Sequence, residues 1–262
     1  MKAVILAGGL GTRLKPFTQV IPKPLLPVGE SSVLEIQIMS LKACGFTDVY
    51  IATNFKSDYV EAFLQSGDRY GLQIHFSREE EPLGTCGPLS LLKDDLDEPF
   101  VLMNGDILTT LKFDEALAFG KAIESDLTII TKEISAPFHF GKITASGNYI
   151  TDIEEKPDLK FEILAGIYVI KPELLQHIPE NAAYGIDELI KDMLARGDKV
   201  AKFLNCEYWL DIGQMHDYET AQQAYEQHFS ALRDAKGWAT RTSDDNPLRA
   251  AASTRYSSKA TK

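Results

Sequence analysis

Short runs of apolar residues alternate along the first half of the chain with longer segments of helical period. The first run, residues 3–7, is rich in branched side chains and has no polar member, which is typical of a strand buried on both faces. Further strands are predicted at 48–53, 72–77, 99–104 and 126–131. Helices are predicted between them at 31–43 (capped by Ser31 or Ser32), from Ser57 as a cap, after Gly84 and at 113–123. This alternation predicts an α/β fold with a doubly wound, mostly parallel sheet.

The pattern changes after residue 134. Segments 140–144, 149–153 and 162–170 have the period of strands, and Ser146-Gly147-Asn148 is a favourable hairpin turn between the first two. We expect an antiparallel insertion that lies across the ligand-binding edge of the sheet. Beyond it, helices are predicted from 172, at 186–195 and at 214–228, with a strand at 199–204.

The composition of the C-terminal segment predicts a domain boundary near residue 229. From about residue 230 no apolar period survives, and residues 233–262 hold seven Lys or Arg against three Asp. We therefore expect one folded domain over residues 1–229, followed by a polar, flexible tail over residues 230–262.

Composition and charge exclude several classes of protein. The 262 residues are 44% apolar and 25% charged, as in an ordinary globular protein. The net charge of −11 argues against a general nucleic-acid binder, and no apolar run is long enough to predict a membrane span. The chain leads directly into a strand, so no signal peptide is expected. Three scattered cysteines fit neither a metal spacing nor a disulfide framework, so reduced thiols in the cytoplasm are expected.

The glycine-rich stretch after the first strand has the chemistry of an anion-binding loop. Gly8, Gly9 and Gly11 allow the backbone to approach a ligand closely, and their N–H groups can bind anionic oxygens. Arg13 adds a planar fork for phosphate, and Lys23 adds a mobile point charge. The loop lacks the Lys-Ser or Lys-Thr of a P-loop and the third glycine of a dinucleotide fingerprint. The alternative is a glycine-rich surface turn.

Two aspartates follow predicted strands at the edge where α/β sheets bind ligands. Asn104-Gly105-Asp106 ends the fourth predicted strand, and Asp211 lies in the segment W-L-D-I-G before the last predicted helix. A carboxylate in such a position can hold Mg²⁺ and leave the ion's other positions to phosphates and water. The alternatives are structural, with Asp106 as a cap after a turn glycine and Asp211 as the N-cap of the helix.

The first 28 residues carry a longer pattern than these glycines, namely G-G-x-G-T-R-L-x-P-x-T-x-x-x-P-K-P-L-L-P-V. This pattern resembles the signature of the sugar-1-phosphate nucleotidylyltransferases, also called nucleotide-sugar pyrophosphorylases. Members of that family join a nucleoside triphosphate to a sugar 1-phosphate and release pyrophosphate. The resemblance covers about residues 1–228 and implies a Rossmann-like, GT-A-type catalytic domain.

The resemblance also implies where the nucleotide and the metal bind. It implies nucleotide contacts at Leu6, Ala7, Gly8, Gly9, Gly11, Thr12, Arg13, Lys23, Glu79, Pro82, Gly84, Thr85, Asn104 and Gly105. The segments N-G-D and W-x-D-x-G resemble the two metal-binding segments of the family, which implies Mg²⁺ at Asp106 and Asp211. The segment E-P-L-G-T-C-G resembles the nucleobase segment, in which Gly84 lets the base lie against the backbone and Glu79 hydrogen-bonds the base edge.

The sugar phosphate is assigned by the same resemblance to the predicted insertion. Residues 154–157, E-E-K-P, resemble a family segment in which Glu155 binds sugar hydroxyls and Lys156 binds the sugar phosphate. Further sugar contacts are implied at Gly141, Ala165 and Gly166. Leu164 departs from the pattern, since many members carry Asn or another polar residue before Ala-Gly, and this leaves the identity of the sugar open. Without the resemblance, residues 154–157 are a charged hairpin end.

These assignments describe one reaction. A sugar phosphate oxygen attacks the α-phosphorus in line and pyrophosphate leaves; because a phosphate nucleophile is already ionised, no general base is needed. Arg13 would hold the departing pyrophosphate, Lys23 would neutralise charge near the reacting phosphorus, and Lys156 would place the nucleophile. The catalytic set is therefore Arg13, Lys23, Asp106, Lys156 and Asp211.

The nucleobase segment most resembles the mannose-1-phosphate guanylyltransferase-like branch, so GTP is favoured. A carboxylate only accepts hydrogen bonds, and guanine offers two adjacent donors, whereas thymine and uracil offer one donor between two carbonyls. Three consecutive glutamates, residues 79–81, leave open which one faces the base. For this reason dTTP and UTP remain alternatives, with CTP behind them.

Two proteins of another kind also remain alternatives. One is a glycosyltransferase that uses a nucleotide sugar, which would need no Arg13 loop to hold pyrophosphate. The other is a non-catalytic sugar-nucleotide-binding regulatory subunit, against which the complete catalytic set argues. The expected partners are a nucleoside triphosphate and a sugar 1-phosphate, with no nucleic acid and no membrane; whether the chain forms a homo-oligomer stays open.

Overall fold

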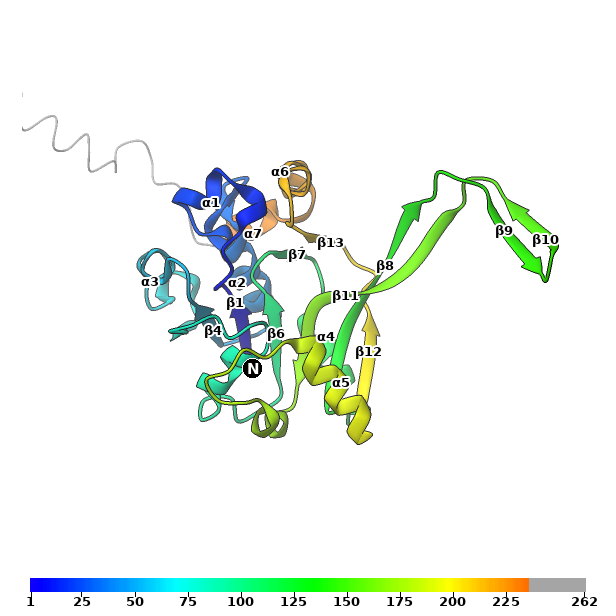
Figure 1. Ribbon diagram of the computed structural model, residues 1–262. Coiled ribbons are helices and arrows are strands. Elements are labelled where there is room, and N and C mark those ends of the chain that lie inside the picture. Colours follow the sequence, from blue (N-terminus) through cyan, green and yellow to red (C-terminus); the bar gives the residue numbers. More distant parts are fainter. Residues whose placement is uncertain (236–262) are drawn as a thin grey trace, which may run out of the picture.

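A seven-stranded sheet forms the centre of the protein (Figure 1). The computed structural model describes residues 1–235. The strand order is β12-β8-β11-β6-β1-β4-β5, and β11 is antiparallel to both of its neighbours while the other pairs are parallel. The strands are β1 (Lys2–Leu6), β4 (Asp48–Thr53), β5 (Gln73–Arg78), β6 (Phe100–Asn104), β8 (Leu127–Pro137), β11 (Asp158–Ile170) and β12 (Val200–Leu204). The predicted mostly parallel α/β sheet is confirmed.

Helices cover both faces of the sheet because successive side chains of each strand point to opposite faces. On β1, Ala3 and Ile5 belong to one apolar core, and Val4 belongs to the other. The first core includes α2 (Val33–Ala43), α3 (Ser57–Leu64) and α4 (Phe113–Ala122), and the second includes the 3-10 helices η4 (Gly87–Leu92) and η5 (Pro172–His177) and α5 (Ile186–Arg196). The sheet is therefore doubly wound, as its alternating pattern predicts.

Several predicted helix starts can be checked at single residues. Ser32 caps α2, because its hydroxyl accepts from the Glu35 N–H at 3.2 Å while the Glu35 carboxylate accepts from the Ser32 N–H at 2.9 Å. Ser57 is the first residue of α3 rather than its cap, and Lys56 precedes it in the left-handed region with φ of 56°. After Gly84 the chain forms the 3-10 helix η4 instead of an α-helix.

A third, smaller core joins the N-terminal segment to the C-terminal helices. Here α6 (Met215–His228) buries Ala221 and Tyr225, and α7 (Ser230–Ala235) packs Leu232 against the cores. Helical structure thus continues past residue 229, where a polar tail was expected. The rest of that expected tail, residues 236–262, lies outside the described residues. The remaining short elements are η1 (Thr12–Leu14), α1 (Phe17–Val20), η2 (Lys23–Leu25), β2 (Pro27–Val28), β3 (Ser31–Ser32), η3 (Asp68–Tyr70), β7 (Ile107–Thr109) and β13 (Trp209–Asp211).

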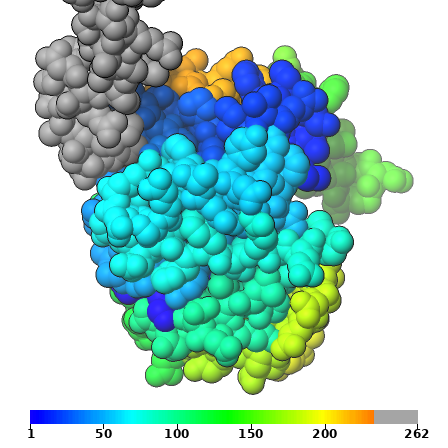
Figure 2. Space-filling view, turned by 90° about the vertical axis from the view of Figure 1, so that its left-hand side faces the viewer, coloured from blue at the N-terminus to red at the C-terminus, as the bar shows by residue number. Residues whose placement is uncertain are grey.

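The antiparallel insertion forms an arm, which we define as residues 132–163. It contains the outer parts of β8 and β11 and the hairpin of β9 (Lys142–Ser146) and β10 (Tyr149–Glu154). The arm projects away from the body in Figure 1 and emerges from behind it in Figure 2. We expected this insertion to lie across the ligand-binding edge of the sheet, and that expectation is wrong. The reason is that β8 and β11 pair without a register shift from Thr131–Leu164 out to Pro137–Asp158, which keeps the ribbon extended.

Candidate active site

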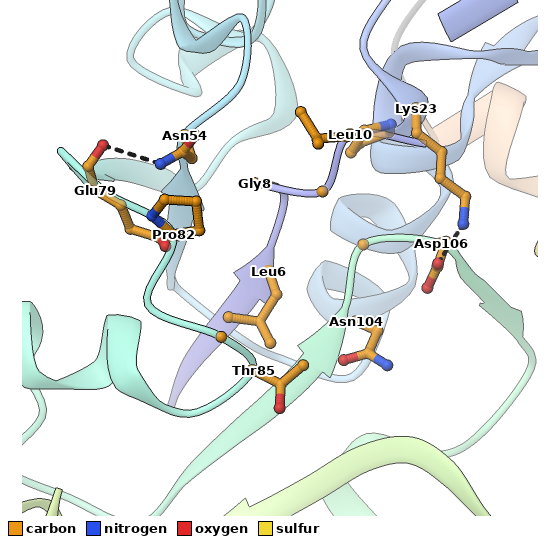
Figure 3. Close-up of a pocket in the computed structure, with 14 residues that line it drawn as sticks. Leu6, Gly8, Leu10, Lys23, Asn54, Glu79, Pro82, Thr85, Asn104 and Asp106 are labelled. Atoms are coloured by element: carbon orange, nitrogen blue, oxygen red, sulfur yellow. Dashed lines mark hydrogen bonds and ion pairs between the residues drawn. The ribbon is translucent and has the colours of Figure 1, made fainter. Parts of the chain in front are cut away.

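A cavity of about 370 Å³ opens where β1, β4 and β6 end (Figure 3). The carboxyl ends of neighbouring parallel strands meet at this edge, which is where an α/β sheet binds its ligands. The cavity is lined by Leu6, Gly8, Gly9, Leu10, Lys23, Pro24, Asn54, Glu79, Pro82, Gly84, Thr85, Asn104, Gly105 and Asp106. Most of the predicted nucleotide-binding residues are therefore brought together in one place.

The N-terminal loop folds back on itself at Gly11, where glycine fits best. Gly11 has φ of 59°, in the left-handed region, and a Cβ on it would lie 2.8 Å from Thr18 Cγ2. The Thr18 hydroxyl donates a hydrogen bond to the Gly11 carbonyl oxygen at 2.7 Å. The chain then returns so that Lys23 reaches Asp106, with which it forms an ion pair (Figure 3). The loop thus places a cation at the mouth of the cavity.

Glu79 forms the opposite wall of the cavity and is 9% exposed. Its Oε2 accepts a hydrogen bond from the Leu83 N–H at 2.8 Å, and its carbonyl oxygen accepts one from the Asn54 amide at 3.3 Å. Burial raises the pKa of the Glu79 carboxyl, and the Leu83 N–H offsets part of this rise. A Cβ on Gly8 would lie 3.0 Å from Glu79 Oε1, so the absence of a side chain at Gly8 keeps space for this oxygen.

The three consecutive glutamates differ in their surroundings. Glu79 lines the cavity, whereas Glu80 and Glu81 are exposed and are not among the lining residues. The sequence left open which of the three glutamates faces the ligand. In the structure it is Glu79 that faces the cavity.

The turn 104–106 between β6 and β7 is held from two sides. The Gly105 N–H donates to the Leu6 carbonyl oxygen at 2.9 Å, and a Cβ on Gly105 would lie 2.5 Å from that same oxygen. From α2, the buried Gln37 amide donates to the carbonyl oxygens of the turn's first residue at 2.9 Å and of Ile107 at 2.8 Å. The carboxylate at the end of the turn is therefore fixed at the mouth of the cavity.

Strands β7 and β13 bring the second aspartate beside the first. Asp211 pairs with Ile107 in this antiparallel ladder, and the Ile212 N–H donates to the Asp106 carbonyl oxygen at 3.0 Å. Two segments about a hundred residues apart in the sequence thus meet through main-chain contacts, and the positions of both aspartates follow from backbone pairing.

Charged groups of both signs gather at this point. Desolvation raises the pKa of Asp211, the negative charge of Asp106 raises it further, and the positive charges of Lys23 and Arg13 lower it. A Cβ on Gly213 would lie 3.7 Å from Arg13 Nη1 and 3.8 Å from Asp211 Oδ2. The two carboxylates and the two cations therefore form one cluster, which we call the charge cluster.

Asp217, and not Asp211, caps the last long helix. Gln214 is the N-cap residue of α6, and its N–H donates to Asp217 Oδ2 at 2.7 Å. The capping alternative for Asp211 is therefore wrong, and its carboxylate belongs to the charge cluster.

The pair of carboxylates in the charge cluster fits Mg²⁺. This ion binds through one or two carboxylates together with waters and phosphate oxygens, and a cation here would relieve the repulsion that raises the pKa of Asp211. Across residues 1–235, no group of three or more His, Cys, Asp or Glu side chains is placed to hold a metal. A magnesium ion at this point would therefore complete its coordination with substrate and water.

Some predicted nucleotide-binding residues lie beside the cavity rather than in its lining. These are Ala7, Gly11, Thr12 and Arg13. Ala7 is buried, and its N–H donates to the Ala52 carbonyl oxygen at 2.7 Å, so its side chain packs in the core. Thr12 and Arg13 are exposed, and the Arg13 guanidinium belongs to the charge cluster.

The predicted sugar-phosphate residues fall into two groups. Ala165 and Gly166 lie at the base of the arm, where a Cβ on Gly166 would lie 2.7 Å from Asn104 Nδ2. Gly141, Glu155 and Lys156 lie on the arm, are exposed, and are not among the residues that line the cavity. A Cβ on Gly141 would lie 3.2 Å from Glu155 Oε2, so these two residues of the arm lie close to each other. Neither of them lines the cavity.

Four residues of the site were missed by the sequence reasoning. Leu10, Pro24 and Asn54 line the cavity, and Gln37 holds the turn below it. Asn54 directly follows β4. Ligands of α/β sheets bind beyond the carboxyl ends of the strands, so this position could have been predicted in the same way as the turn after β6. Gln37 lies in the middle of a helix that reads as apolar, and no pattern marks it.

The carboxyl edge of this mostly parallel sheet carries a glycine-rich loop, paired carboxylates and two cations, an arrangement that suits a phosphorylated ligand. The chain belongs to the nucleotidyl transferase family, whose family model matches residues 2–228. It is 36% identical over 246 residues to the mannose-1-phosphate guanyltransferase of Schizosaccharomyces pombe, covering 90% of this chain and 66% of that protein. It is 34% identical over 234 residues to the probable mannose-1-phosphate guanylyltransferase 2 of Oryza sativa, covering 86% and 64%.

Solved structures with the same fold include two from bacteria. A putative glucose-1-phosphate thymidylyltransferase from Bacillus anthracis, in complex with a sucrose, matches with a TM-score of 0.70 and 27% identity over 85% of this chain and 94% of that one. HddC from Yersinia pseudotuberculosis complexed with GMP-PN matches with a TM-score of 0.67 and 25% identity over 86% and 99%. This chain spans just under two thirds of the curated relatives, at 66% and 64% of their length.

Within the described residues no helix is long and apolar enough to cross a membrane.

Proposed function

We propose that this chain transfers a nucleotidyl group from a nucleoside triphosphate, with GTP favoured, to a sugar 1-phosphate and releases pyrophosphate. The observation that supports this most is the charge cluster, which sets Asp106 and Asp211 beside Lys23 and Arg13 at the mouth of a cavity. Such a cluster suits a reaction in which phosphate charge is redistributed while no proton needs to be removed.

In this proposal the chemistry is an in-line displacement at the α-phosphorus. An oxygen of the sugar phosphate forms a new P–O bond, and the bond to the β-phosphate oxygen breaks with its electron pair on the departing pyrophosphate. Lys23 neutralises charge near the reacting phosphorus, and Arg13 holds the pyrophosphate. Lys156 orients the attacking phosphate, and Glu155 binds the sugar hydroxyls.

Mg²⁺ is the proposed metal, held by Asp106 and Asp211. When bound, it would supply positive charge that neutralises the triphosphate oxygens. The paired carboxylates support this assignment, since neither of them is used as a helix cap.

GTP is the proposed nucleotide because Glu79 is the carboxylate that lines the cavity. Its Oε1 lies beside Gly8 and can accept from the two adjacent donors of guanine, while Oε2 is engaged by the Leu83 N–H. The relatives named as mannose-1-phosphate guanyltransferases and the HddC complex with GMP-PN support the same base. The thymidylyltransferase likeness keeps dTTP, and with it UTP, as the second candidate.

Mannose 1-phosphate is the first sugar substrate that we propose to test, because it is named in the curated relatives. Other hexose 1-phosphates and heptose 1-phosphates belong in the same test, since Leu164 stands where a polar residue would contact the sugar. The free thiols of Cys44, Cys86 and Cys206 support our proposal that the protein works in the cytoplasm.

A substrate matrix tests the proposed function. GTP, dTTP, UTP and CTP are each combined with hexose and heptose 1-phosphates and Mg²⁺, and pyrophosphate release is measured. We expect pyrophosphate only when both substrates are present, with GTP preferred. Release without sugar phosphate would indicate triphosphate hydrolysis, and the absence of turnover with every pair would support a regulatory subunit instead.

A further inference from the structure

The arm holds the proposed sugar-phosphate residues out of reach of the cavity in their own chain. From Leu164 to Asp158 the arm is a continuous strand paired with β8. Six residues at about 3.3 Å each make this segment about 20 Å long. Lys156 comes just before Asp158 in the chain, so it lies past the far end of this segment, on the arm that projects from the body in Figure 1. The arm of one chain, as it stands, does not bring Lys156 to its own cavity.

The base of the arm is fixed to the body, which disfavours folding back onto the same chain. The pairing of β8 with β11 shifts register near residue 165, and this is where a bend would have to occur. However, Ala165 is fully buried and its carbonyl oxygen accepts from Trp209 Nε1 at 2.9 Å. Gly166 packs against Asn104, so bending here would break both contacts.

The exposed surface of the arm is unusually apolar. Phe140 is 71% exposed, Tyr149 81% and Ile153 65%, and all three belong to the hairpin end of the arm. An isolated two-stranded hairpin is only marginally stable in water, and clustered exposed apolar side chains mark an interaction site. The arm therefore needs a surface to pack on.

A second group of exposed apolar side chains lies in the N-terminal segment, and one of them lines the cavity. Leu10, Phe17 and Val20 are 57%, 46% and 67% exposed, and Leu10 also lines the cavity. These residues belong to the N-terminal loop that carries Arg13 and Lys23. The segment that carries two cations of the charge cluster thus also carries exposed apolar side chains, of which Leu10 lies at the cavity.

We propose that the arm of one copy of this chain docks on the cavity mouth of a second copy, placing its Lys156 and Glu155 beside that copy's charge cluster. The role of Lys156 rests on the proposed function. A second copy is the occupant because it carries both the cavity that Lys156 needs and, in its N-terminal segment, exposed apolar side chains on which the arm can pack. A twofold axis would let two copies exchange arms, so that both apolar surfaces on each chain are covered.

The charges at the cavity agree with this exchange. Within one body, Lys23 and Arg13 face two carboxylates, so the cluster has no excess of positive charge. A triphosphate and a sugar phosphate together bring several negative charges into the same place. The partner's Lys156 supplies a further cation where the nucleophilic phosphate must lie.

The mass of the particle in solution tests the docking. By light scattering on a sizing column, the full chain should have twice its 29.1 kDa mass. A double variant, Phe140→Ser with Ile153→Ser, should become a monomer, while Leu194→Ser, an exposed apolar residue of α5, should remain a dimer. Melting curves should be similar for the bodies of all three, because these side chains are exposed. A monomeric full chain, or a double variant that remains a dimer, overturns the proposal.

Hybrid dimers test whether the arm works in the partner's site. Lys156→Ala and Asp106→Asn chains carrying different tags are produced together, and hybrids are isolated through both tags. If the arm acts in the partner, one of the two sites has an intact arm and an intact body, so the hybrid should regain about half of the activity. If the arm acts within its own chain, both sites are defective and activity stays at the level of the single variants, which overturns the proposal. A full chain without turnover on any substrate pair would refute the proposed function, and the mass measurement would then decide the docking on its own.

Discussion

Gly105→Ala is the substitution whose effect can be worked most directly from the geometry. The added Cβ would lie 2.5 Å from the Leu6 carbonyl oxygen, which is closer than real Cβ contacts. Because this oxygen belongs to the main chain of a central strand, the turn has to move and the 2.9 Å hydrogen bond from the Gly105 N–H is lost. Overpacking costs about 1–3 kcal/mol and the hydrogen bond about 1 kcal/mol, while the less flexible unfolded chain returns about 0.4–1 kcal/mol. We expect a net loss of about 1–3.5 kcal/mol in the free energy of unfolding.

The assay for this prediction is urea unfolding followed by circular dichroism, with Gly9→Ala as the matched control. A Cβ on Gly9 would meet no atom within 4 Å, so its free energy of unfolding should stay within about 0.5 kcal/mol of the parent or rise slightly. Because the displaced turn carries Asp106, Gly105→Ala should also need more Mg²⁺ for half-maximal turnover. If Gly105→Ala is as stable as Gly9→Ala, the turn is not held as described.

The other predictions concern single charges of the site. Arg13→Ala should lower kcat about 10²-fold or more, since a lost preorganised charge partner costs about 3 kcal/mol, without a change in melting temperature; turnover equal to that of the parent would refute its role. Asp106→Asn and Asp211→Asn should each raise the Mg²⁺ concentration for half-maximal rate in a titration, whereas Asp217→Ala, which removes the acceptor of the Gln214 N–H in α6, should mainly lower the melting temperature and change the Mg²⁺ dependence less than either. Burial raises the pKa of Glu79, so the folded state binds this proton more tightly than the unfolded state and loses stability as pH rises through the raised pKa. Glu79→Gln should therefore gain stability relative to the parent as the pH rises above the ordinary pKa of glutamate, measured by urea unfolding, and a stability difference that does not change with pH would contradict the assignment.

Much of the fold could be predicted because its strands are buried on both faces. A run such as residues 48–53 is apolar except at its two ends, and β4 (Asp48–Thr53) has the predicted bounds. The direction of the arm could not be predicted, because it depends on the unbroken pairing of β8 with β11, and the alternation of apolar residues in a strand is the same whether it lies over the sheet or beyond it. The helical segment after residue 229 was missed because it is short and polar in sequence, although its Leu232 packs against the cores.

Some residues of the site could likewise be predicted from the sequence, and others could not. Residues of the loop and of the turn after β6 could be expected to lie together because both follow neighbouring strands of one sheet, and the carboxyl ends of such strands meet at one edge. The sequence could not decide whether Asp211 caps α6 or belongs to the charge cluster. The structure decides it, because the carboxylate of Asp217 accepts the hydrogen bond at the start of α6. Asn54 and Gln37 are ordinary amides in the sequence, and only the packing of β4 and α2 around the cavity gives them contacts there.

The most direct test of nucleotidyl transfer is to follow separately labelled phosphorus atoms of GTP. Enzyme, Mg²⁺ and an accepted sugar 1-phosphate are incubated with GTP labelled at either the α- or the γ-phosphorus, and the products are separated. The proposed reaction predicts that the α label appears in the nucleotide sugar and that the γ label leaves in pyrophosphate. A γ label found on the sugar, or released as orthophosphate while the α label stays in GDP, would contradict it.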